Sequence, residues 1–234
     1  MTEKLIFEKK RQRAPSQRAI QTRNRILDAA ERVFAAQGFD GATIRDIAAE
    51  ARTPVGLVHH HGGGKVDLFA KTVDRRAVEL SQLRLGALAT RKSKGPLTLT
   101  ELLRCFYDPF LDLTEKSGEQ WMCYARLVAH VSADARWREL AAHCFDPTAQ
   151  KFIDEIALLY PNAPRPAIAA GFVYSVSAML ALLTSVWRMG ALGDGDAQTE
   201  NRDGLIAFCS AGMAACLAEA TVPETGPSSR GRET

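Results

Sequence analysis

Apolar residues recur at helical spacing through most of this chain, and the strict alternation that a half-buried strand would show is missing. No internal repeat is visible. The pattern therefore predicts an all-α fold. The expected helices lie at 22–37, at two short stretches that begin at 43 and 54, and at 65–88, 99–117, 119–132, 134–160, 165–190 and 202–220. Pro147 is expected to interrupt the helix at 134–160, and Asp146 could cap a new start there.

The clearest helix-end signals lie before residue 65. Gly38 stands where a left-handed helix end is wanted. Thr43 can cap a helix, with Asp46 three residues later completing a capping box. Pro54 suits the first position of the next helix, and glycines 62–64 break the chain. Two short helices joined by a three-residue turn form a shape that fits the major groove of DNA.

The distribution of charge is informative only near the N-terminus. The 234 residues are 46% hydrophobic and 24% charged, which suits a soluble protein with a sizeable core, and the net charge of +3 says nothing about nucleic acid. Between Lys9 and Arg25, however, lie seven positive residues and no acid. This segment is either a solvated tail or a basic arm that contacts phosphates, and both can hold if it orders on DNA.

Cysteine usage and hydropathy bear on the compartment. The five cysteines form no close pairs, which suits the reducing cytoplasm, and the N-terminal segment has no apolar stretch typical of a signal peptide. Residues 166–187 carry no charge over a length that could span a bilayer. Their glycine, serine and alanine content favours a buried helix, so no membrane partner is expected.

The second of the two short helices has an apolar side, Val55 and Val58, that is expected to face inward. Its other side is free for DNA. Arg45 and His60 are the expected polar contacts to bases, and Leu57 could touch thymine methyl groups. The residues expected at the DNA are Thr43, Arg45, Thr53, Pro54, Gly56, Leu57, His59, His60 and Lys65.

Other chemistry finds little support. Adjacent residues of a helix point about 100° apart, so His59, His60 and His61 cannot share one metal ion. No Ser/His/Asp arrangement, phosphate-binding loop or metal-ligand spacing is present. We therefore expect no catalytic residue, no metal, no cofactor and no enzymatic activity.

The N-terminal residues resemble the TetR family of bacterial transcriptional repressors. The similarity covers about 50 residues in unbroken order and spacing. It rests on Thr22, Ile26-Leu27-Asp28-Ala29-Ala30, Phe34, Gly38-Phe39, Thr43, Asp46-Ile47-Ala48, Gly56, His61, Gly63 and Lys65. The resemblance implies a homodimeric repressor that binds double-stranded operator DNA, with a palindromic site, and is released by a small-molecule effector. It also implies a basic arm over 1–19, a helix-turn-helix domain over 20–64, an effector-binding and dimerisation domain over 65–221, and a disordered tail over 222–234.

The chain departs from the family pattern at three positions. Arg52 stands where the turn usually has glycine, which adds roughly 1 kcal/mol of strain if the residue is left-handed. Thr53 replaces an apolar residue, and Gly62 replaces an aromatic one. Gly62→Phe is therefore expected to stabilise the domain. These departures keep open an alternative, a dimeric α-helical protein-interaction module with degenerate DNA binding.

The resemblance also places an effector site and a dimer interface in the second domain. The effector is expected to be apolar or amphipathic, since nothing in the sequence indicates a strongly charged site. The segment 125–140 has a weak similarity to regulators linked to lipid metabolism. The candidate lining residues are Phe106, Phe110, Trp121, Tyr124, Leu127, His130, His143, Phe172, Tyr174 and Met179, although such residues are also typical of plain core.

Small residues crowd the last two expected helices and would let helices approach closely, either between subunits or within one chain. The candidates for the dimer interface are Ala167, Gly171, Ser175, Ala178, Ala207, Ala211, Ala214 and Ala215.

Overall fold

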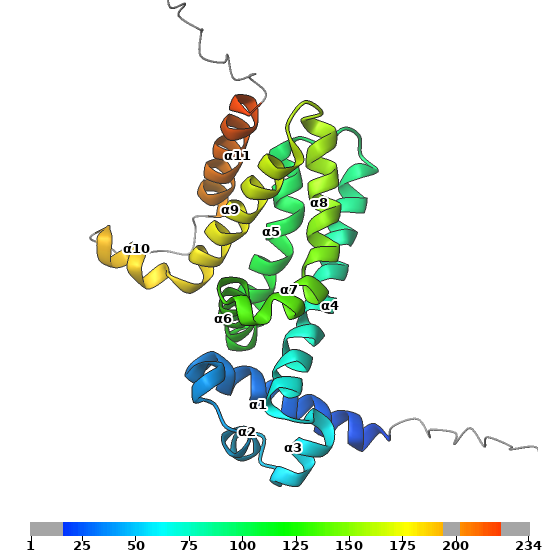
Figure 1. The fold of residues 1–234 in the computed structure, drawn as a ribbon, viewed down its shortest axis with the longest axis vertical. Helices are drawn as coiled ribbons and strands as arrows, with labels where there is room; N and C mark the ends of the chain where they lie inside the picture. Colours follow the sequence, from blue (N-terminus) through cyan, green and yellow to red (C-terminus); the bar gives the residue numbers. More distant parts are fainter. Residues whose placement is uncertain (1–15, 194–201, 221–234) are drawn as a thin grey trace, which may run out of the picture.

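The computed structural model describes residues 16–193 and 202–220, and within those residues every regular element is a helix (Figure 1). The predicted all-α fold is confirmed. The elements are α1 Gln17–Gly41, α2 Ile44–Glu50, α3 Val55–Gly62, α4 Lys65–Lys92, α5 Leu99–Lys116, α6 Glu119–Ala133, the 3₁₀ turn η1 Ala135–Trp137, α7 Arg138–Cys144, α8 Asp146–Leu159, α9 Arg165–Thr184, α10 Val186–Leu192 and α11 Arg202–Glu219.

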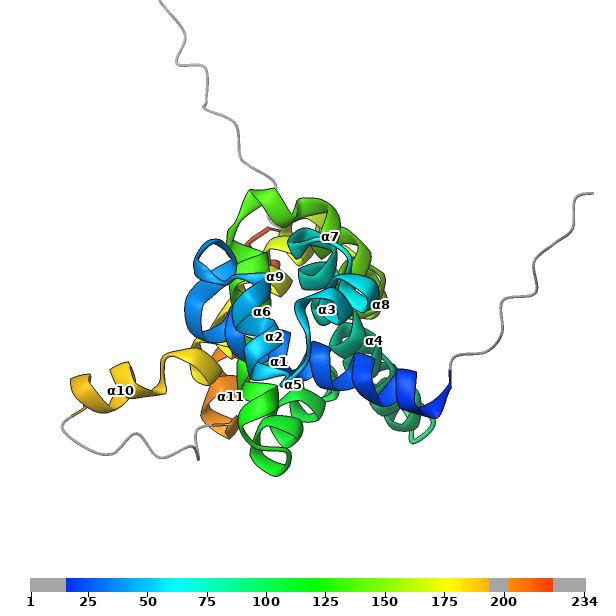
Figure 2. The same ribbon diagram turned by 90° about the horizontal axis from the view of Figure 1, so that it is seen from below.

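The molecule consists of a small unit and a larger one that share α4. Helices α1 to α3 form the small unit, called the head, at one end of the long axis (Figure 1). Helix α4 starts in the head and continues into the larger unit, called the body, which also contains α5 to α9 and α11. There α4 packs against α5, α6, α7 and α8. Seen from the head end, α1 to α3 lie over the end of this bundle, and α10 projects to one side (Figure 2).

The head folds around a small aromatic and aliphatic core. Ile26 and Phe34 of α1 are fully buried, and Phe34 meets Phe69 of α4 edge to face with ring centroids 5.0 Å apart. The expected capping box at α2 is present, because Thr43 Oγ1 accepts the Asp46 N–H and the Asp46 carboxylate accepts the Thr43 N–H. Local signals and tertiary packing therefore agree in this part of the chain.

Helix α1 is longer than its apolar pattern predicts. It begins at Gln17 with Ser16 as its cap, five residues before the expected start, and thus includes the last residues of the predicted arm. Residues 1–15 lie outside the described residues, as does the predicted tail at 222–234. Gly38 has the expected positive φ of 70°, but the helical path resumes after this kink and ends at Gly41.

Two long helices expected in the body are divided. Residues 134–160 form η1, α7 and α8, and the break before α8 falls beside Pro147, which occupies the first turn of α8. Residues 165–190 divide at Ser185, where α9 ends and α10 begins. The interruption at Pro147 was expected, and α8 does begin at Asp146. Helical periodicity continues across Ser185, so it could not show that break.

Helix α9 is the one helix among residues 16–193 and 202–220 with the length and apolar composition to cross a membrane. Buried core helices of soluble proteins have the same length and composition. Only 44% of its apolar window is buried within this chain, and the rest is partly or fully exposed in the single chain.

Candidate nucleic-acid interface and internal cavity

The outer side of α3 is free of packing against the rest of the chain. Pro54, Gly56 and Leu57 are exposed there, whereas Val58 is fully buried on the inner side. The expectation that Val55 is also buried is wrong, because 39% of its surface is exposed. A helix this short buries a single row, which Val58 and Gly62 occupy, and Val55 in the first turn adds an apolar side chain to the free face.

The three histidines of α3 have different environments. His59 is exposed and its Nδ1 lies 3.2 Å from the Gly63 carbonyl oxygen, to which it donates at the end of the helix. His60 is exposed, and its ring meets His61 edge to face at 5.0 Å. His61 is partly buried, and this burial, followed by the charges of His60 and Arg23, lowers its pKa. His60 is thus the histidine best placed for a partner outside the chain.

Positive side chains surround this face without internal partners. Within the described part of the chain, no ion pair involves Arg18, Arg23 or Arg25 of α1, Arg45 of α2, or Arg52 in the turn. All of these side chains are exposed. The effect of Arg23 on the His61 pKa shows that the start of α1 lies near α3. The elements next to α3 therefore carry several exposed positive charges that form no ion pair among the described residues.

Two of the remaining predicted DNA contacts, Thr53 and Lys65, are partly buried, and Lys65 also has partners within the chain. Thr43 is exposed at the start of α2, and Thr53 is partly buried in the turn. The Lys65 ammonium lies 3.1 Å from the Asp40 carbonyl oxygen and 4.7 Å from the centroid of the Phe39 ring. Lys65 therefore ties the start of α4 to the end of α1 in this structure.

The turn between α2 and α3 is strained. Arg52 has a φ of 48°, and it is the one residue other than glycine with a positive φ among residues 16–193 and 202–220. We expect Arg52→Gly to raise the free energy of unfolding by about 1 kcal/mol, because glycine adopts this conformation without a steric cost. Urea denaturation checks this. The control Arg45→Gly, in the helical part of α2, should lower stability by about 1 kcal/mol, and a fall for both variants would refute strain at Arg52.

Gly62 does not leave a hole where the family has an aromatic residue. A Cβ built at Gly62 would lie 2.9 Å from Leu68 Cδ1 and 3.2 Å from Leu68 Cβ. Leu68 is itself fully buried, so it occupies the space that the aromatic ring would need. The structure therefore argues against a stabilising Gly62→Phe, and we expect the opposite effect on the head.

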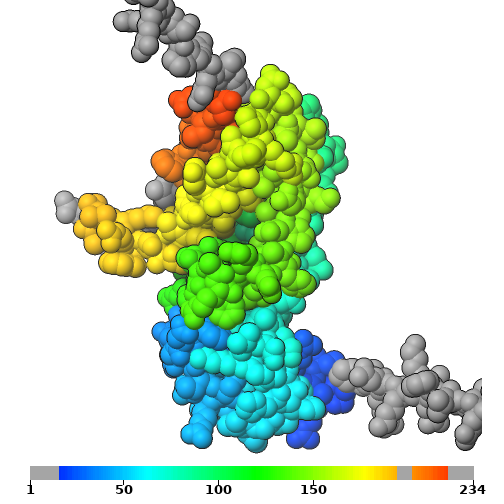
Figure 3. Space-filling view, in the orientation of Figure 1, coloured from blue at the N-terminus to red at the C-terminus, as the bar shows by residue number. Residues whose placement is uncertain are grey.

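The body encloses a cavity of about 410 Å³ between α4, α5, α6, α7, α8 and α9. Figure 3 shows the side of the molecule on which α7, α8 and α9 come together. This volume is typical of small-molecule sites. The predicted lining residues that do lie on its wall are Phe106, Phe110, Tyr124, Phe172 and Met179.

The other predicted lining residues lie elsewhere. Leu127 is plain core, and Trp121 packs under Arg76, whose guanidinium carbon lies 4.8 Å from the ring centroid. His130 packs against Phe69 beside the head. His143 is exposed with Nε2 3.4 Å from Asp74, and Tyr174 is 69% exposed on the outer side of α9. Helical spacing shows that these side chains share faces, but not which faces border the cavity.

Sequence reasoning missed Arg84, the charged residue of the cavity wall. Its Nε donates to the Phe106 carbonyl oxygen at 2.8 Å, and its guanidinium carbon lies 3.6 Å from the centroid of the Phe106 ring. Burial lowers the pKa of Arg84 to about 9, so the side chain remains charged at neutral pH. The sequence does contain a pattern that places Arg84 on the inner side of α4. The buried residues Val73, Ala77 and Leu80 follow one another at spacings of four and three, and Arg84 comes four residues after Leu80.

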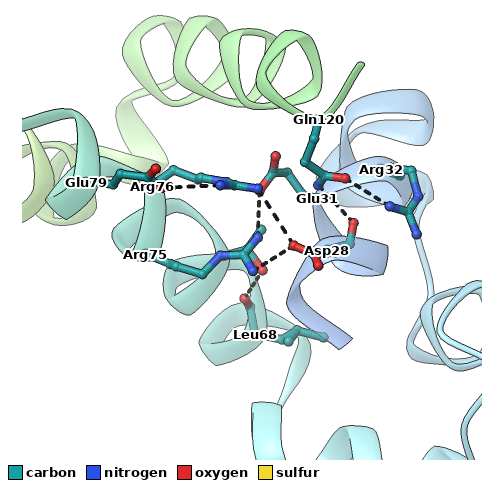
Figure 4. Close-up of polar contacts among 9 residues, drawn as sticks. Asp28, Glu31, Arg32, Leu68, Arg75, Arg76, Glu79 and Gln120 are labelled. Atoms are coloured by element: carbon teal, nitrogen blue, oxygen red, sulfur yellow. Dashed lines mark hydrogen bonds and ion pairs between the residues drawn. The ribbon is translucent and has the colours of Figure 1, made fainter. Parts of the chain in front are cut away.

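A network of charged side chains joins the head to the body (Figure 4). Glu31 of α1 is fully buried, and its Oε2 accepts hydrogen bonds from Arg75 at 2.9 Å and Arg76 at 3.1 Å, both on α4. Arg75 also pairs with Asp28 at 2.8 Å. Burial raises the pKa of Glu31, although the two arginines oppose this shift.

The same network reaches α2 and α6. Gln120 of α6 donates to the Asp28 carbonyl oxygen at 3.1 Å and accepts from Arg32 at 2.9 Å (Figure 4). Arg32 in turn pairs with Glu50 of α2 at 2.6 Å. The position of the head on the body therefore depends on polar contacts from four helices.

The small residues of α9 and α11 divide into two groups. Gly171 and Ser175 face α11 of the same chain, where a Cβ at Gly171 would lie 3.2 Å from Met213 Cγ, so packing within one chain accounts for them. Ala207, Ala211 and Ala215 are exposed, and Ala167, Ala178 and Ala214 are partly buried. Sequence reasoning missed the large side chains beside them, since Phe208 is 74% exposed and Tyr174, which lies near it, is 69% exposed.

Two family models match this chain. The one described as "Bacterial regulatory proteins, tetR family" matches residues 26–72, and the one described as "Tetracyclin repressor-like, C-terminal domain" matches residues 104–212. The chain belongs to the TetR family. Its two matches fall on the head with the start of α4 and on the body from α5 to α11, which confirms the predicted membership and architecture. TetR family proteins are transcriptional regulators and not enzymes.

Individual TetR relatives match over short segments of about 60 residues. The chain is 40% identical over 60 residues to the HTH-type transcriptional repressor SCO4008 of Streptomyces coelicolor, which is 26% of this chain and 31% of that protein. It is 41% identical over 58 residues to the HTH-type transcriptional regulator SrpR of Pseudomonas putida, which is 25% of this chain and 27% of that protein. The matches thus span about a third or less of these two relatives.

Solved structures resemble the whole fold. A transcriptional regulator from Pseudomonas aeruginosa PAO1 superposes with a TM-score of 0.58 at 19% identity over 86% of this chain and 93% of that chain. A TetR-like regulator from Rhodococcus sp. RHA1 gives a TM-score of 0.58 at 21% identity over 88% and 99%. At these identities the likeness concerns the fold alone.

Proposed function

We propose that this TetR family protein is a cytoplasmic, ligand-responsive repressor that binds palindromic operator DNA as a homodimer. The free face of α3 between unpaired arginines carries the DNA-binding part of this proposal. The expected contacts are those named from the sequence, with Val55 added beside Leu57. Phosphate contacts would come from the exposed arginines of α1, and base contacts from Arg45 and His60.

The dimer is proposed to form through α9 and α11. Their outer surface combines exposed alanines with Tyr174 and Phe208, which are 69% and 74% exposed. Contiguous apolar surface of this kind marks interfaces in soluble proteins. A second copy would also cover the part of α9 that one chain leaves exposed, which is consistent with a soluble protein that needs no membrane.

Ligand control is proposed to run through α4. This single helix forms part of the cavity wall at Arg84 and carries Arg75 and Arg76 into the junction with the head. A ligand that favours one position of α4 would shift the population between DNA-binding and released states. The ligand can act only through a difference in its affinity for those states.

Affinity selection of genomic DNA fragments, followed by sequencing, tests the DNA-binding proposal. We expect an enriched site with two-fold symmetry and half-sites about one helical turn, roughly 34 Å, apart. A folded dimer that enriches no sequence would favour the alternative, a dimeric interaction module whose DNA binding has degenerated.

Arg45→Ala and His60→Ala are each expected to weaken binding to the selected operator by about 10–100-fold, the equivalent of one lost base contact. Both side chains are exposed, so the dimer and its melting temperature should be unchanged. Fluorescence anisotropy with operator and random duplexes measures the effect. Arg165→Ala, at the start of α9, is the control that should leave affinity unchanged. Equal losses on both duplexes would instead mean phosphate contacts.

A further inference from the structure

The cavity in the body combines apolar walls with one partly buried positive charge. Phe106, Phe110, Phe172 and Met179 supply aromatic and thioether surface, and Arg84 supplies the guanidinium. The wall also contains a hydroxyl pair, Ser81 and Thr148, whose oxygens lie 2.6 Å apart and satisfy each other. Asp146 lines the cavity from the exposed start of α8.

Arg84 is partly buried and has few partners for its charge. Its hydrogen bonds go to the Phe106 carbonyl oxygen and, at 3.9 Å, to the Met179 sulfur. Among residues 16–193 and 202–220, no carboxylate forms an ion pair with it, Asp146 included. A guanidinium has five N–H donors, and a buried charge without a counter-ion is costly. The neighbouring aromatic rings offset only part of that cost.

We propose that Arg84 binds the carboxylate of an amphipathic organic acid whose apolar part fills the cavity between α4, α5, α8 and α9. The proposal deepens the proposed function, on which it rests, by naming the chemical class of the effector. A planar carboxylate matches the guanidinium fork and neutralises its single charge. A phosphate ester at neutral pH would carry close to two negative charges and leave one unbalanced in an apolar site, so the carboxylate is favoured.

The position of Arg84 also connects this anion to the head. Arg84 lies eight residues beyond Arg76 on α4, a distance of about 12 Å along the helix axis. Neutralising Arg84 removes a reason for its guanidinium to stay against Phe106 of α5. A change in the α4–α5 contact would therefore reach Arg75 and Arg76 through one continuous helix.

The test compares acids with matched neutral compounds on the purified full-length protein. The probes are octanoic, decanoic and 4-phenylbutyric acids, their methyl esters, and decyl phosphate, measured by calorimetry and thermal shift. We expect at least one acid to bind at least tenfold more tightly than its ester and than decyl phosphate. Equal binding of acid and ester, tighter binding of decyl phosphate, or binding by none of the acids would overturn the carboxylate assignment.

Variants test the role of Arg84 itself. Arg84→Met should abolish the preference for the acid over its ester, and Arg84→Lys, which keeps the charge but loses the planar fork, should retain part of it. Arg126→Met removes an exposed arginine of α6 and should leave the preference unchanged. An acid preference that survives in Arg84→Met overturns the inference. If Arg84→Met does not fold, Arg84→Lys and the acid–ester comparison in the wild type still decide.

Operator binding measured in the presence of the same probes separates this inference from the proposed function. Release of DNA by acids alone supports both. Release by esters as strongly as by acids would retain ligand control and refute the role of Arg84. Acid binding that depends on Arg84 but leaves operator affinity unchanged would retain the site and refute ligand control.

Discussion

Replacing Glu31 by alanine is expected to lower the free energy of unfolding by about 2–4 kcal/mol, because it leaves Arg75 and Arg76 without their shared partner. The carboxylate is fully buried, and the side chains of the two arginines are only 22% and 16% exposed. Asp28 still pairs with Arg75, which keeps the expected loss below that of an isolated buried pair. Urea denaturation followed by circular dichroism measures the loss.

Glu79→Ala is the matched control for this variant. Glu79 also pairs with Arg76, at 3.3 Å, but its side chain is 47% exposed. Solvent screens such a pair, so its removal should cost less than about 1 kcal/mol. A loss as large as that of Glu31→Ala would mean that the arginines, and not the burial of Glu31, determine the stability of the junction.

The pH dependence of the Glu31 contribution has a defined sign. Burial raises the pKa of Glu31 above its ordinary value of 4.5, so the folded state binds the proton more tightly than the unfolded chain. The stability that Glu31 contributes is therefore full below pH 4.5 and declines as the pH rises through the folded-state pKa. Glu31→Gln cannot titrate, and its deficit relative to the wild type should shrink over that interval. A deficit that grows with pH would contradict the direction of the shift.

Gly62→Phe is expected to destabilise the protein by about 3 kcal/mol, the upper end of the usual cost of overpacking. The new ring would enter the space that Leu68 fills and would push α3 away from α4. Since α3 carries the proposed base contacts, operator affinity should fall with stability. Thermal denaturation and anisotropy measure the two effects.

Gly56→Ala, in the same helix, is expected to stabilise the protein. No atom outside its own helix lies within 4 Å of a Cβ built at Gly56, and the position is exposed. Alanine should therefore raise stability by up to about 1 kcal/mol through its higher helix propensity. Operator affinity is expected to fall, because the added methyl group faces the DNA. A stabilising Gly62→Phe or a destabilising Gly56→Ala would show that α3 packs differently.

Sequence reasoning succeeded where a local signal determines a local structure. The capping box of Thr43 and Asp46 and the positive φ of Gly38 follow from side-chain chemistry within a few residues. The resemblance raised a left-handed Arg52 only as a condition, because the family usually has glycine at that position, and the structure shows a positive φ there. The helices of the body could be placed to within a few residues, and the interruption at Pro147 was expected, whereas the break at Ser185 was not.

Sequence reasoning failed for features that depend on which helix surfaces contact each other. Leu68 fills the space beside Gly62, a contact across two helices that no spacing rule contains. Tyr174 was assigned to the cavity although it lies on the outer surface, because an apolar helix such as α9 gives no periodic signal for its inner side. Arg84 was overlooked because a charged residue is expected at the surface, although it continues the buried row of α4.

Because α4 is long, a small tilt at its cavity end would move the head by a large distance. From Arg84 to Lys65 the helix extends about 28 Å at 1.5 Å per residue, so a tilt of about 10° about the cavity end moves the head by roughly 5 Å. In a two-fold dimer both heads move, and their separation changes by about 10 Å against a half-site spacing of roughly 34 Å. The separation of the two heads would then no longer match the separation of the two operator half-sites. Release of DNA would then need no unfolding of either head. The tilt of α4 alone would keep the second head from reaching the major groove of its half-site.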